Sequence, residues 1–581
     1  MTARHTRTLV VMLLGLGLGP GSARGAIADP GDGVPDCVAA PFRELAALPA
    51  ERSVPPVIAR GTSRATVDPT GSVHLLVILA QYPDRPARIA PARFESHLFG
   101  TTGFTFRRFY EDLSDGALSV TGDVWGWVTL PETQSFYSGG TNGAGVGPYP
   151  NNGQRMTEDA VQAAVTGGLD LSDYDANGDG VVDALLVIHS GQGYEWAVSS
   201  ALTPETDLFA INSHKWSVVD GNFGSGQPRV ADYFTCPELQ LVRPTVAPLW
   251  ADSIATIGVY CHEFGHVLGL PDFYDTETFE DRVGQWDLMD YGTWNRVRGV
   301  AETAAPGALP GSFSAWSRAY LDWNLPEVLA ADPGRTITAS RTLTPIATGG
   351  SAVQLRSNPG DVDWRSGDPG SGEFFLAEMR TPTGWDAGLP GSGVLLYHVD
   401  EGRVTNRASA YADGGGLLTL EPQDADLALT TGITDPWPGA QSVFDESSVP
   451  NSHLFDESES GVEVVVHSSG ATSASATFTV TNTEIEVALP YATPNPWLPA
   501  RLSGVSLQLT FEGSAPDDVI ITVHDATGRR VRTLDASSLV DAGRAARWDG
   551  TNDAGAPVPA GMYFFRVRNG IHGTGKVLLL R

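Results

Sequence analysis

Basic residues are scarce in this chain of 581 residues: 37 lysines and arginines stand against 68 aspartates and glutamates, a formal net charge of −31. A surface this acidic repels phosphate backbones, so we expect no nucleic-acid partner. Long hydrophobic runs are scarce as well. Outside the N-terminal run LVVMLLGLGLG, no stretch approaches the roughly eighteen apolar residues of a membrane span. We therefore expect no transmembrane segment in the mature chain.

Cysteine is rare, since the chain has only Cys37, Cys236 and Cys261. Three cysteines allow at most one disulfide within the chain. If the protein is exported, Cys236 and Cys261 are the expected pair. Cys37 is then left over, either as an incidental thiol, which we favour, or as a thiolate that caps a catalytic metal from a propeptide.

The N-terminus has the pattern of a bacterial-type export signal. Arg4 and Arg7 precede the apolar run, and Ala26-Ile27-Ala28 supplies a cleavage pattern of small residues, with ARG at 23–25 as the alternative. We interpret residues 1–28 as a signal peptide. Residues 29–70 are rich in Pro, Ala and Arg and lack periodicity, which indicates a propeptide or leader. The protein is thus expected to be secreted or attached to the cell surface, and to be made as a zymogen.

The length of the chain predicts several domains. Residues 71–330 mix buried strands such as VHLLVILAQY (73–82) with helices such as SIATIGVYCHEFGHVLGL (253–270), which indicates an α/β unit. Residues 331–487 contain short alternating runs between Gly, Pro and Asp turns, the pattern of an all-β domain. Residues 488–581 begin with a proline-rich linker and predict a final β-sandwich. The predicted fold class is multidomain, α/β plus all-β.

A candidate metal site lies in the second of those helices. His262 and His266 are four residues apart, so both imidazoles project from one helical face and can share a metal ion. Glu263 lies about 100° further round the helix, where it can reach a metal-bound water as a general base. The alternative is a buried helix with two structural histidines, but the apolar helix and the downstream carboxylates favour zinc.

The third zinc ligand is left open between two aspartates. Gly269 permits the chain to turn back, which can bring Asp272 or Asp275 towards the ion. Two histidines, one carboxylate and one water make the open four-coordinate geometry of catalytic zinc.

The segments HEFGHVLGLPDFYD (262–275) and GQWDLMDYGTW (284–294) resemble the immune inhibitor A family of secreted zinc metallopeptidases. They share the extended H-E-x-x-H-x-x-G-x-x-D pattern of metzincin-like enzymes, and the likeness covers about residues 70–480. It implies a metzincin-like catalytic domain that hydrolyses peptide bonds, with Met289 as the Met-turn beneath the ligands.

The resemblance also bears on two residues whose roles are open. The metzincin pattern maps to Asp272, which we favour slightly over Asp275. Tyr291 stands two residues after Met289, where some metzincins place a tyrosine that assists the oxyanion. A role in packing or hydrogen bonding is equally compatible with this position.

The segment DYDANGDGVVD (173–183) places oxygen-bearing side chains at every second residue around a glycine. The candidate ligands are Asp173, Asp175, Asn177, Asp179 and Asp183. Hard oxygen ligands in this spacing suit calcium, in a structural role. The alternative is an acidic turn before the next strand.

The last ninety residues, with VHDATGRRVRTL and GMYFFRV, resemble the Ig-like fold of flagellar-hook-capping proteins and the related type A sorting domains of type IX secretion. The likeness implies passage across an outer membrane, secretion machinery as a partner, and attachment at the cell surface. A plain stability or adhesion module is the alternative.

Together these features predict an exported zinc endopeptidase acting on protein or peptide substrates. The alternative is a surface adhesion or glycan-binding protein in which the peptidase domain is a scaffold. The intact Glu263 argues against a scaffold, because a degenerate enzyme does not need the base. A zinc hydrolase of another bond is set aside on the family resemblance alone.

Overall fold

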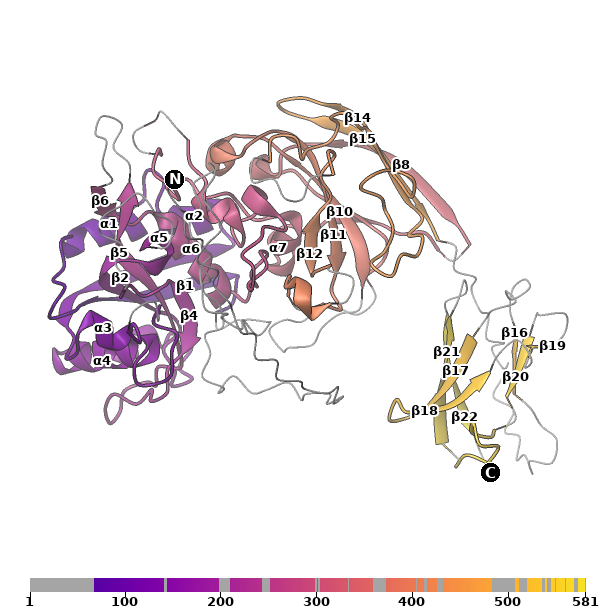
Figure 1. The fold of residues 1–581 in the computed structure, drawn as a ribbon, viewed down its shortest axis with the longest axis horizontal. Coiled ribbons are helices and arrows are strands. Elements are labelled where there is room, and N and C mark those ends of the chain that lie inside the picture. The colour runs from indigo at the N-terminus through magenta and orange to yellow at the C-terminus, as the bar shows by residue number, and fades with distance from the viewer. Residues whose placement is uncertain are drawn as a thin grey trace, which may run out of the picture. The chain divides into compact units, whose positions relative to one another are not determined.

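The computed structural model describes most of the chain between residues 67 and 482 and parts of the C-terminal region (Figure 1). The described residues are 67–140, 144–197, 209–242, 251–297, 300, 303–332, 334–358, 372–403, 405–411, 415–425, 432–482, 507–510, 520–534, 539–540, 545–548, 550–559, 561–568 and 573–579. The predicted signal peptide, most of the predicted leader and Cys37 lie outside them. Within this part of the chain, no helix combines the length and apolar character needed to cross a membrane.

The first part of the chain forms a mixed sheet in the order β2-β1-β3-β5-β4, with β6 also paired to β5. The strands are β1 (Gly71–Gln81), β2 (Leu118–Thr129), β3 (Leu185–Gln192), β4 (His214–Ser217), β5 (Asp232–Val242) and β6 (Ala251–Ile254). The pairs β1–β2, β1–β3 and β3–β5 are parallel, whereas β4 and β6 run antiparallel to β5. This largely parallel sheet agrees with the predicted α/β unit.

Side chains of β1 alternate between two hydrophobic cores, because successive residues of a strand point to opposite faces. Leu75, Val77 and Leu79 belong to the first core, and Leu76 and Ile78 belong to the second. The first core is covered by α1 (Pro91–Phe99), α2 (Phe106–Leu113) and α6 (Ile257–Val267), and the second by α3 (Gln134–Tyr137) and α4 (Gly153–Thr166) (Figure 1). Burial on both faces explains the near-continuous apolar sequence of β1.

The helix that carries the metal motif is shorter than predicted. The sequence predicts a helix over 253–270, but the structure gives β6 up to Ile254 and starts α6 at Ile257. The first residues of the predicted helix are strand because Ile254 pairs with Leu239 of β5. Tertiary pairing here outweighs the helical pattern of the sequence.

The predicted disulfide is wrong. Cys236 and Cys261 are both buried free thiols, the first in β5 and the second in α6. Both pack in the first hydrophobic core, where burial raises the pKa of each thiol well above its ordinary value. They behave as small apolar side chains of that core.

Two further sheets follow the α/β part, in agreement with the predicted β-rich region. One has the order β12-β11-β10-β9-β7 and the other β13-β14-β15-β8. The strands are β7 (Glu327–Leu329), β8 (Thr336–Leu343), β9 (Val353–Leu355), β10 (Glu373–Arg380), β11 (Gly393–Asp400), β12 (Leu418–Leu420), β13 (Val443–Phe444), β14 (Val462–Ser469) and β15 (Ala474–Thr481).

Strand β10 connects the β-rich region to the α/β part through its core. Phe374 and Leu376 pack in the first hydrophobic core together with α6, whereas Phe375 and Ala377 pack against the second β sheet. The β-rich region therefore shares a hydrophobic core with the α/β part. The remaining short helices are α5 (Tyr194–Ala197), α7 (Ala315–Tyr320), η1 (Leu171–Tyr174), η2 (Gly284–Trp286), η3 (Tyr291–Trp294), η4 (Ile346–Thr348), η5 (Gly384–Gly388) and η6 (Ala408–Ala410).

The C-terminal region is built of two antiparallel sheets, β16-β20-β19 and β18-β17-β21-β22. Their strands are β16 (Leu507–Thr510), β17 (Ile520–Asp525), β18 (Arg530–Leu534), β19 (Leu539–Val540), β20 (Ala545–Trp548), β21 (Gly561–Arg568) and β22 (Gly573–Leu579). Trp548 of one sheet contacts Tyr563 of the other, with ring centroids 5.2 Å apart, and both side chains are buried. This packing agrees with the predicted β-sandwich.

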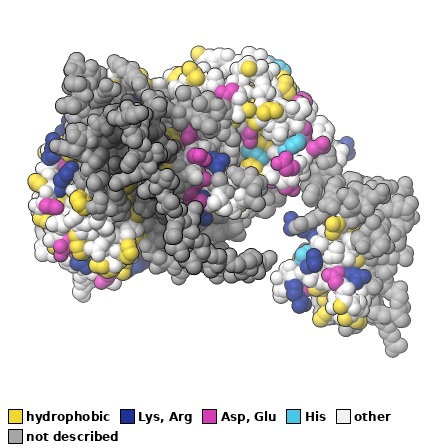
Figure 2. Space-filling view, in the orientation of Figure 1, with side chains coloured by type: hydrophobic (Ala, Val, Ile, Leu, Met, Phe, Trp, Pro, Cys, Tyr) yellow, Lys and Arg dark blue, Asp and Glu magenta, His cyan; other side chains and the backbone are white. Residues whose placement is uncertain are grey.

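On the face shown in Figure 2, acidic side chains of the described residues occur in several small groups, interspersed with basic and hydrophobic ones. The net charge of −31 is therefore not confined to one patch of that face.

Candidate metal centre

Three side chains converge next to α6: His262 and His266 from the helix, and Asp272 from the loop that follows. Nε2 of His262 lies 3.1 Å from Oδ1 of Asp272 and 3.2 Å from Nε2 of His266. Nε2 of His266 lies 3.4 Å from the same carboxylate oxygen. Ligands about 2.05 Å from a tetrahedral zinc lie about 3.3 Å from one another, so these separations suit that ion.

The outer nitrogens of both histidines are held by backbone carbonyl groups. Nδ1 of His262 lies 3.0 Å from the carbonyl oxygen of Leu288, and Nδ1 of His266 lies 2.7 Å from that of Leu270. Since a carbonyl only accepts, each Nδ1 carries a proton, so each Nε2 can present a lone pair to a metal ion. Thr293 adds a hydroxyl 3.0 Å from Nδ1 of His262 and donates its own proton to Leu288.

This donor set fits a cation. Two nitrogen lone pairs and a carboxylate oxygen face one another in a site with side chains no more than 7% exposed. Such an arrangement of acceptors is repulsive unless a positive charge lies between them. Among the described residues, it is the one group of three or more His, Cys, Asp or Glu side chains that converges closely enough to hold a metal ion.

The charges at the site favour an ionised ligand set. Burial alone raises the pKa of Asp272, but the two neighbouring histidines outweigh it and lower this pKa to about 2. Burial lowers the pKa of His262, but the hydrogen bond with Asp272 outweighs burial and raises this pKa to about 9. A proton on Nε2 of His262 thus occupies the place that a bound cation would take, and metal binding would release it. For His266 burial dominates and lowers the pKa. Asp272 is therefore a carboxylate at neutral pH, as a metal ligand must be.

The turn after α6 determines which aspartate reaches the histidines. Gly269 adopts a φ of +96°, a left-handed conformation that reverses the chain after the helix. Asp272 then faces the histidines. Asp275 instead accepts hydrogen bonds from the backbone N–H groups of Glu277 (2.8 Å) and Thr278 (3.1 Å). The structure thus brings Asp272 to the histidines and uses Asp275 to close the next turn.

Met289 lies directly beneath α6. A methyl group placed on Gly265, between the two histidines, would come within 2.5 Å of the Met289 sulfur. The backbone N–H of Met289 donates to the buried carboxylate of Asp287 (2.7 Å), and its carbonyl accepts from Phe273 (2.8 Å). Met289 is fully buried, and its role as a Met-turn stays a prediction.

Glu263 and Tyr291 are placed differently with respect to the site. Glu263 is fully buried in α6 beside His262, and its charge adds to the effect of burial in raising the pKa of Tyr110. The hydroxyl of Tyr291 donates to the backbone carbonyl of Phe279 at 3.0 Å. A second tyrosine also lies near the site, since the ring of Tyr274 stacks near His262 with centroids 6.4 Å apart. No pattern in the sequence singled out this residue.

The predicted calcium loop is closed by hydrogen bonds between its side chains and its backbone. Asp175 accepts from the N–H groups of Asp179 and Gly180, both at 3.0 Å, and Asp183 accepts from Ala176 at 3.0 Å. Burial raises the pKa of Asp183, and the charges of Asp175 and Asp179 raise it further. The loop thus gathers negative charge, and calcium binding there stays a prediction.

Two parts of this sequence are similar to known protein families. Residues 94–327 match the family model described as the immune inhibitor A peptidase M6 catalytic domain. This part of the chain is thus similar to a peptidase M6 catalytic domain. The resemblance predicted from the metal motif is therefore confirmed. Residues 502–571 match the FlgD Ig-like domain, which confirms the second predicted resemblance.

Two kinds of curated relative share part of this sequence. Immune inhibitor A of Bacillus thuringiensis subsp. alesti is 31% identical over 236 residues, which cover 36% of this chain and 33% of that protein. The pre-pro-metalloprotease PrtV of Vibrio cholerae serotype O1 (strain M66-2) is 28% identical over 286 residues, which cover 42% of this chain and 29% of that protein. The chain thus matches about a third of the length of these relatives.

Proposed function

We propose that this protein is a secreted zinc-dependent endopeptidase that hydrolyses peptide bonds in proteins. The observation that carries the proposal is the convergence of His262, His266 and Asp272 next to a buried glutamate of the same helix. The match to a peptidase M6 domain and to a relative named as a metalloprotease supports the same reaction class.

Zinc held by His262, His266 and Asp272 would supply Lewis-acid chemistry, lowering the pKa of a coordinated water to about 7 and polarising the scissile carbonyl. The carboxylate of Glu263 is the proposed general base, which takes the proton of the attacking water and delivers it to the leaving nitrogen. The backbone acceptors at both Nδ1 atoms keep the imidazoles in one tautomer, and the burial of the site excludes bulk water.

A metzincin-like arrangement is part of this proposal. Its support is the packing of Met289 against Gly265 below the two histidines. The predicted oxyanion role of Tyr291 stays a prediction, because its hydroxyl is engaged with the carbonyl of Phe279. In Tyr291→Phe, a tenfold or greater loss of kcat at constant KM supports that role, whereas unchanged kcat supports a structural one.

The test is cleavage of casein by the protein without residues 1–28, next to Glu263→Gln, with the zinc content of both measured. We expect one zinc per chain in both proteins, and activity in the first that falls by at least about a thousandfold in the second. Zinc without activity in the first protein calls for a second assay after removal of residues 29–70, the proposed propeptide. Equal activity in both proteins contradicts the role of Glu263, and a protein without zinc contradicts the proposed centre.

Export and surface attachment are proposed from the two ends of the chain. The apolar N-terminal run supports export, and the FlgD Ig-like match over 502–571 supports a contact with secretion machinery. Cell fractionation of a strain that produces residues 1–487 tests the second point: accumulation of this shortened protein inside the cell supports a role in export.

Calcium is the proposed occupant of the loop 173–183. The support is the mutual repulsion of Asp175, Asp179 and Asp183, which a divalent cation relieves. Calcium should raise the unfolding temperature of the wild type but not that of Asp179→Ala. An equal response in both proteins contradicts this assignment.

Surface adhesion or glycan binding with a non-essential peptidase domain is the second candidate. Its support is the large share of the chain in β sheets beyond residue 330. Glycan binding by the Glu263→Gln protein at wild-type affinity, with no casein cleavage by either protein, favours this candidate.

A further inference from the structure

A loop of the β-rich region lies against the loop that carries the third metal ligand. Nδ2 of Asn406 donates to the carbonyl oxygen of Phe273 at 2.7 Å, although the two residues are 133 positions apart. Phe273 directly follows Asp272. Near the tip of the same loop, Glu277 pairs with Arg407 at 3.4 Å and accepts from the hydroxyl of Ser409.

Asn406 is itself held rigidly. Only 1% of its surface is exposed, and its amide makes two more hydrogen bonds to β12. Nδ2 donates to the Leu418 carbonyl at 2.6 Å, and Oδ1 accepts from the Leu418 N–H at 3.0 Å. Hydrogen bonds thus hold both the nitrogen and the oxygen of the amide group, so the side chain cannot change rotamer without breaking them. Asn406 can therefore fix the position of the Phe273 carbonyl that it binds.

The peptide after the third ligand is held from the opposite side by the Met-turn. The N–H of Phe273 donates to the carbonyl of Met289 at 2.8 Å, while its carbonyl accepts from Asn406. The position of Asp272 thus depends on two supports, one from the α/β part and one from the β-rich region.

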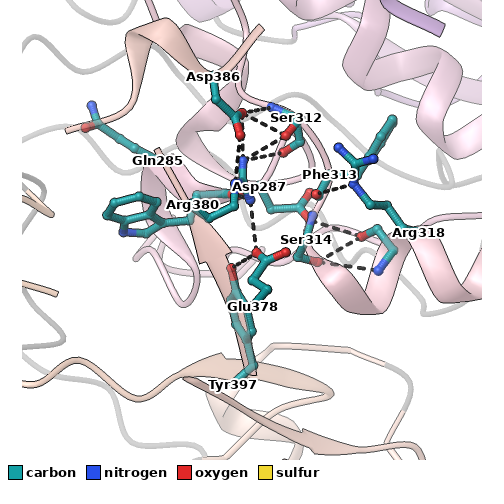
Figure 3. Close-up of polar contacts among 12 residues, drawn as sticks. Gln285, Asp287, Ser312, Phe313, Ser314, Arg318, Glu378, Arg380, Asp386 and Tyr397 are labelled. Atoms are coloured by element: carbon teal, nitrogen blue, oxygen red, sulfur yellow. Dashed lines mark hydrogen bonds and ion pairs between the residues drawn. The ribbon is translucent and has the colours of Figure 1, made fainter. Parts of the chain in front are cut away.

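The segment before Met289 is also connected to the β-rich region, through the polar contacts around Arg380 (Figure 3). Arg380 at the end of β10 donates to the carbonyl of Trp286 at 2.8 Å. The next residue, Asp287, accepts from the N–H of Met289 and from Ser314. Arg380 is fully buried between the carboxylates of Glu378 and Asp386, and it also donates to the hydroxyl of Ser312.

We propose that Asn406 is a positioning residue of the metal centre, through which the β-rich region completes the site. The inference rests on the proposed function, since it concerns the affinity of the same site for zinc. In the absence of the Asn406 bond, the carbonyl of Phe273 loses its partner and the loop can move Asp272 away from the histidines. Partners beyond the direct ligands typically contribute 10–100-fold to metal affinity.

The test compares zinc affinity in the full-length wild type, Asn406→Ala and Asn482→Ala. Asn482 is the matched control, because its amide also donates to a backbone carbonyl in the β-rich region, that of Ala331 at 3.0 Å. Zinc dissociation constants are measured by chelator competition, and circular dichroism verifies that each metal-free protein is folded. We expect a 10–100-fold weaker affinity in Asn406→Ala and less than a twofold change in Asn482→Ala.

Substitution of cobalt for zinc gives a second measurement, which a general loss of stability does not change. The visible spectrum of bound Co²⁺ reports ligand geometry, so we expect it to change in Asn406→Ala and not in Asn482→Ala. If Asn406→Ala does not fold, Arg407→Ala, at the edge of the same contact, is tested in its place. We expect it to weaken zinc affinity as well, by less than Asn406→Ala would.

The inference is overturned if folded Asn406→Ala binds zinc as tightly as the wild type and has an unchanged cobalt spectrum. If Asn406→Ala does not fold, the same result in Arg407→Ala overturns it. A comparable loss in Asn482→Ala also overturns it, since the effect is then not specific to the site. If the wild type itself binds no zinc, the proposed function fails, and this inference fails with it. If the wild type binds zinc but its affinity does not depend on Asn406, only this inference fails.

Discussion

Oδ1 of Asp272 lies 3.1 Å from Nε2 of His262, whereas Asp275, three residues later, accepts backbone hydrogen bonds in its own turn. The two aspartates are chemically equivalent in sequence and are separated only by the course of the loop. Asp272 is the proposed third ligand, and Asp275 accepts hydrogen bonds that stabilise the following turn.

The corresponding substitutions should therefore have different effects. Asp272→Asn removes a charged ligand and should lower zinc affinity and kcat/KM by on the order of a hundredfold or more. Asp275→Asn keeps an oxygen that can accept from Glu277 and should retain one zinc per chain. Zinc content after dialysis, measured by mass spectrometry, checks both variants. Loss of zinc in Asp275→Asn with retention in Asp272→Asn would reverse the assignment.

The packing of Gly265 against Met289 gives a prediction about stability. A methyl group on Gly265 meets the flexible end of the Met289 side chain at 2.5 Å, so Gly265→Ala should destabilise by about 1–3 kcal/mol. Met289→Ala in the same protein removes the clash. The double variant should therefore lose less stability than the sum of the two single variants.

Gly258, in the first turn of α6, is the matched control for that pair. A methyl group there meets the carbonyl oxygen of Thr293 at 2.1 Å, and backbone cannot move aside as a side chain can. Gly258→Ala should be more destabilising than Gly265→Ala, and Met289→Ala should not rescue it. Urea unfolding of the three single variants and the two double variants measures these differences.

Much of the metal centre could be predicted from sequence because it is local. The spacing of His262 and His266 is sufficient to place both on one helical face, and the glycine after the helix indicates a reversal of the chain. The choice between Asp272 and Asp275 could not be predicted, because it depends on backbone hydrogen bonds within the loop. Asn406 was missed for a different reason: a lone asparagine 133 residues from its partner leaves no pattern in the sequence.

The incorrect predictions have a common physical origin. The start of α6 was placed too early because strand pairing of Ile254 with Leu239 is a tertiary contact that apolar periodicity does not reveal. The disulfide between Cys236 and Cys261 was inferred from export and from counting, whereas the two thiols pack as apolar groups in one core. Boundaries and pairings depend on the fold, and residue spacing does not encode them.

The buried charges around Arg380 predict a contrast between two salt bridges of the β-rich region. Arg380 is fully buried with Asp386 at 2.8 Å, while Arg341 and Glu327 form an exposed pair. Arg380→Met leaves two carboxylates buried without their cation and should cost about 3–5 kcal/mol. Arg341→Met should have little effect, because solvent screens an exposed pair. Chemical denaturation compares the two, and equal losses would contradict the importance of burial.

The last prediction concerns pH. Glu195 is fully buried, and burial raises its pKa from 4.5 to about 7 against the opposing hydrogen bonds from Ser213. Between pH 4.5 and about 7 the native state keeps this proton while the unfolded state loses it, so native stability falls as the pH rises. The shift in pKa corresponds to a contribution of at most about 3 kcal/mol to the free energy of unfolding. This contribution is present below pH 4.5 and lost above about pH 7.

Glu195→Gln, which cannot ionise, isolates this contribution. The variant should have nearly the stability of the wild type at pH 5 and exceed it at pH 8, because only the wild type must bury a charge or bind a proton there. Unfolding in guanidinium chloride at the two pH values, with chelator present to exclude metal effects, measures the difference. A variant that is less stable than the wild type at pH 8 would show that Glu195 is ionised and stabilising in the native state, so that its hydrogen bonds with Ser213 outweigh its burial.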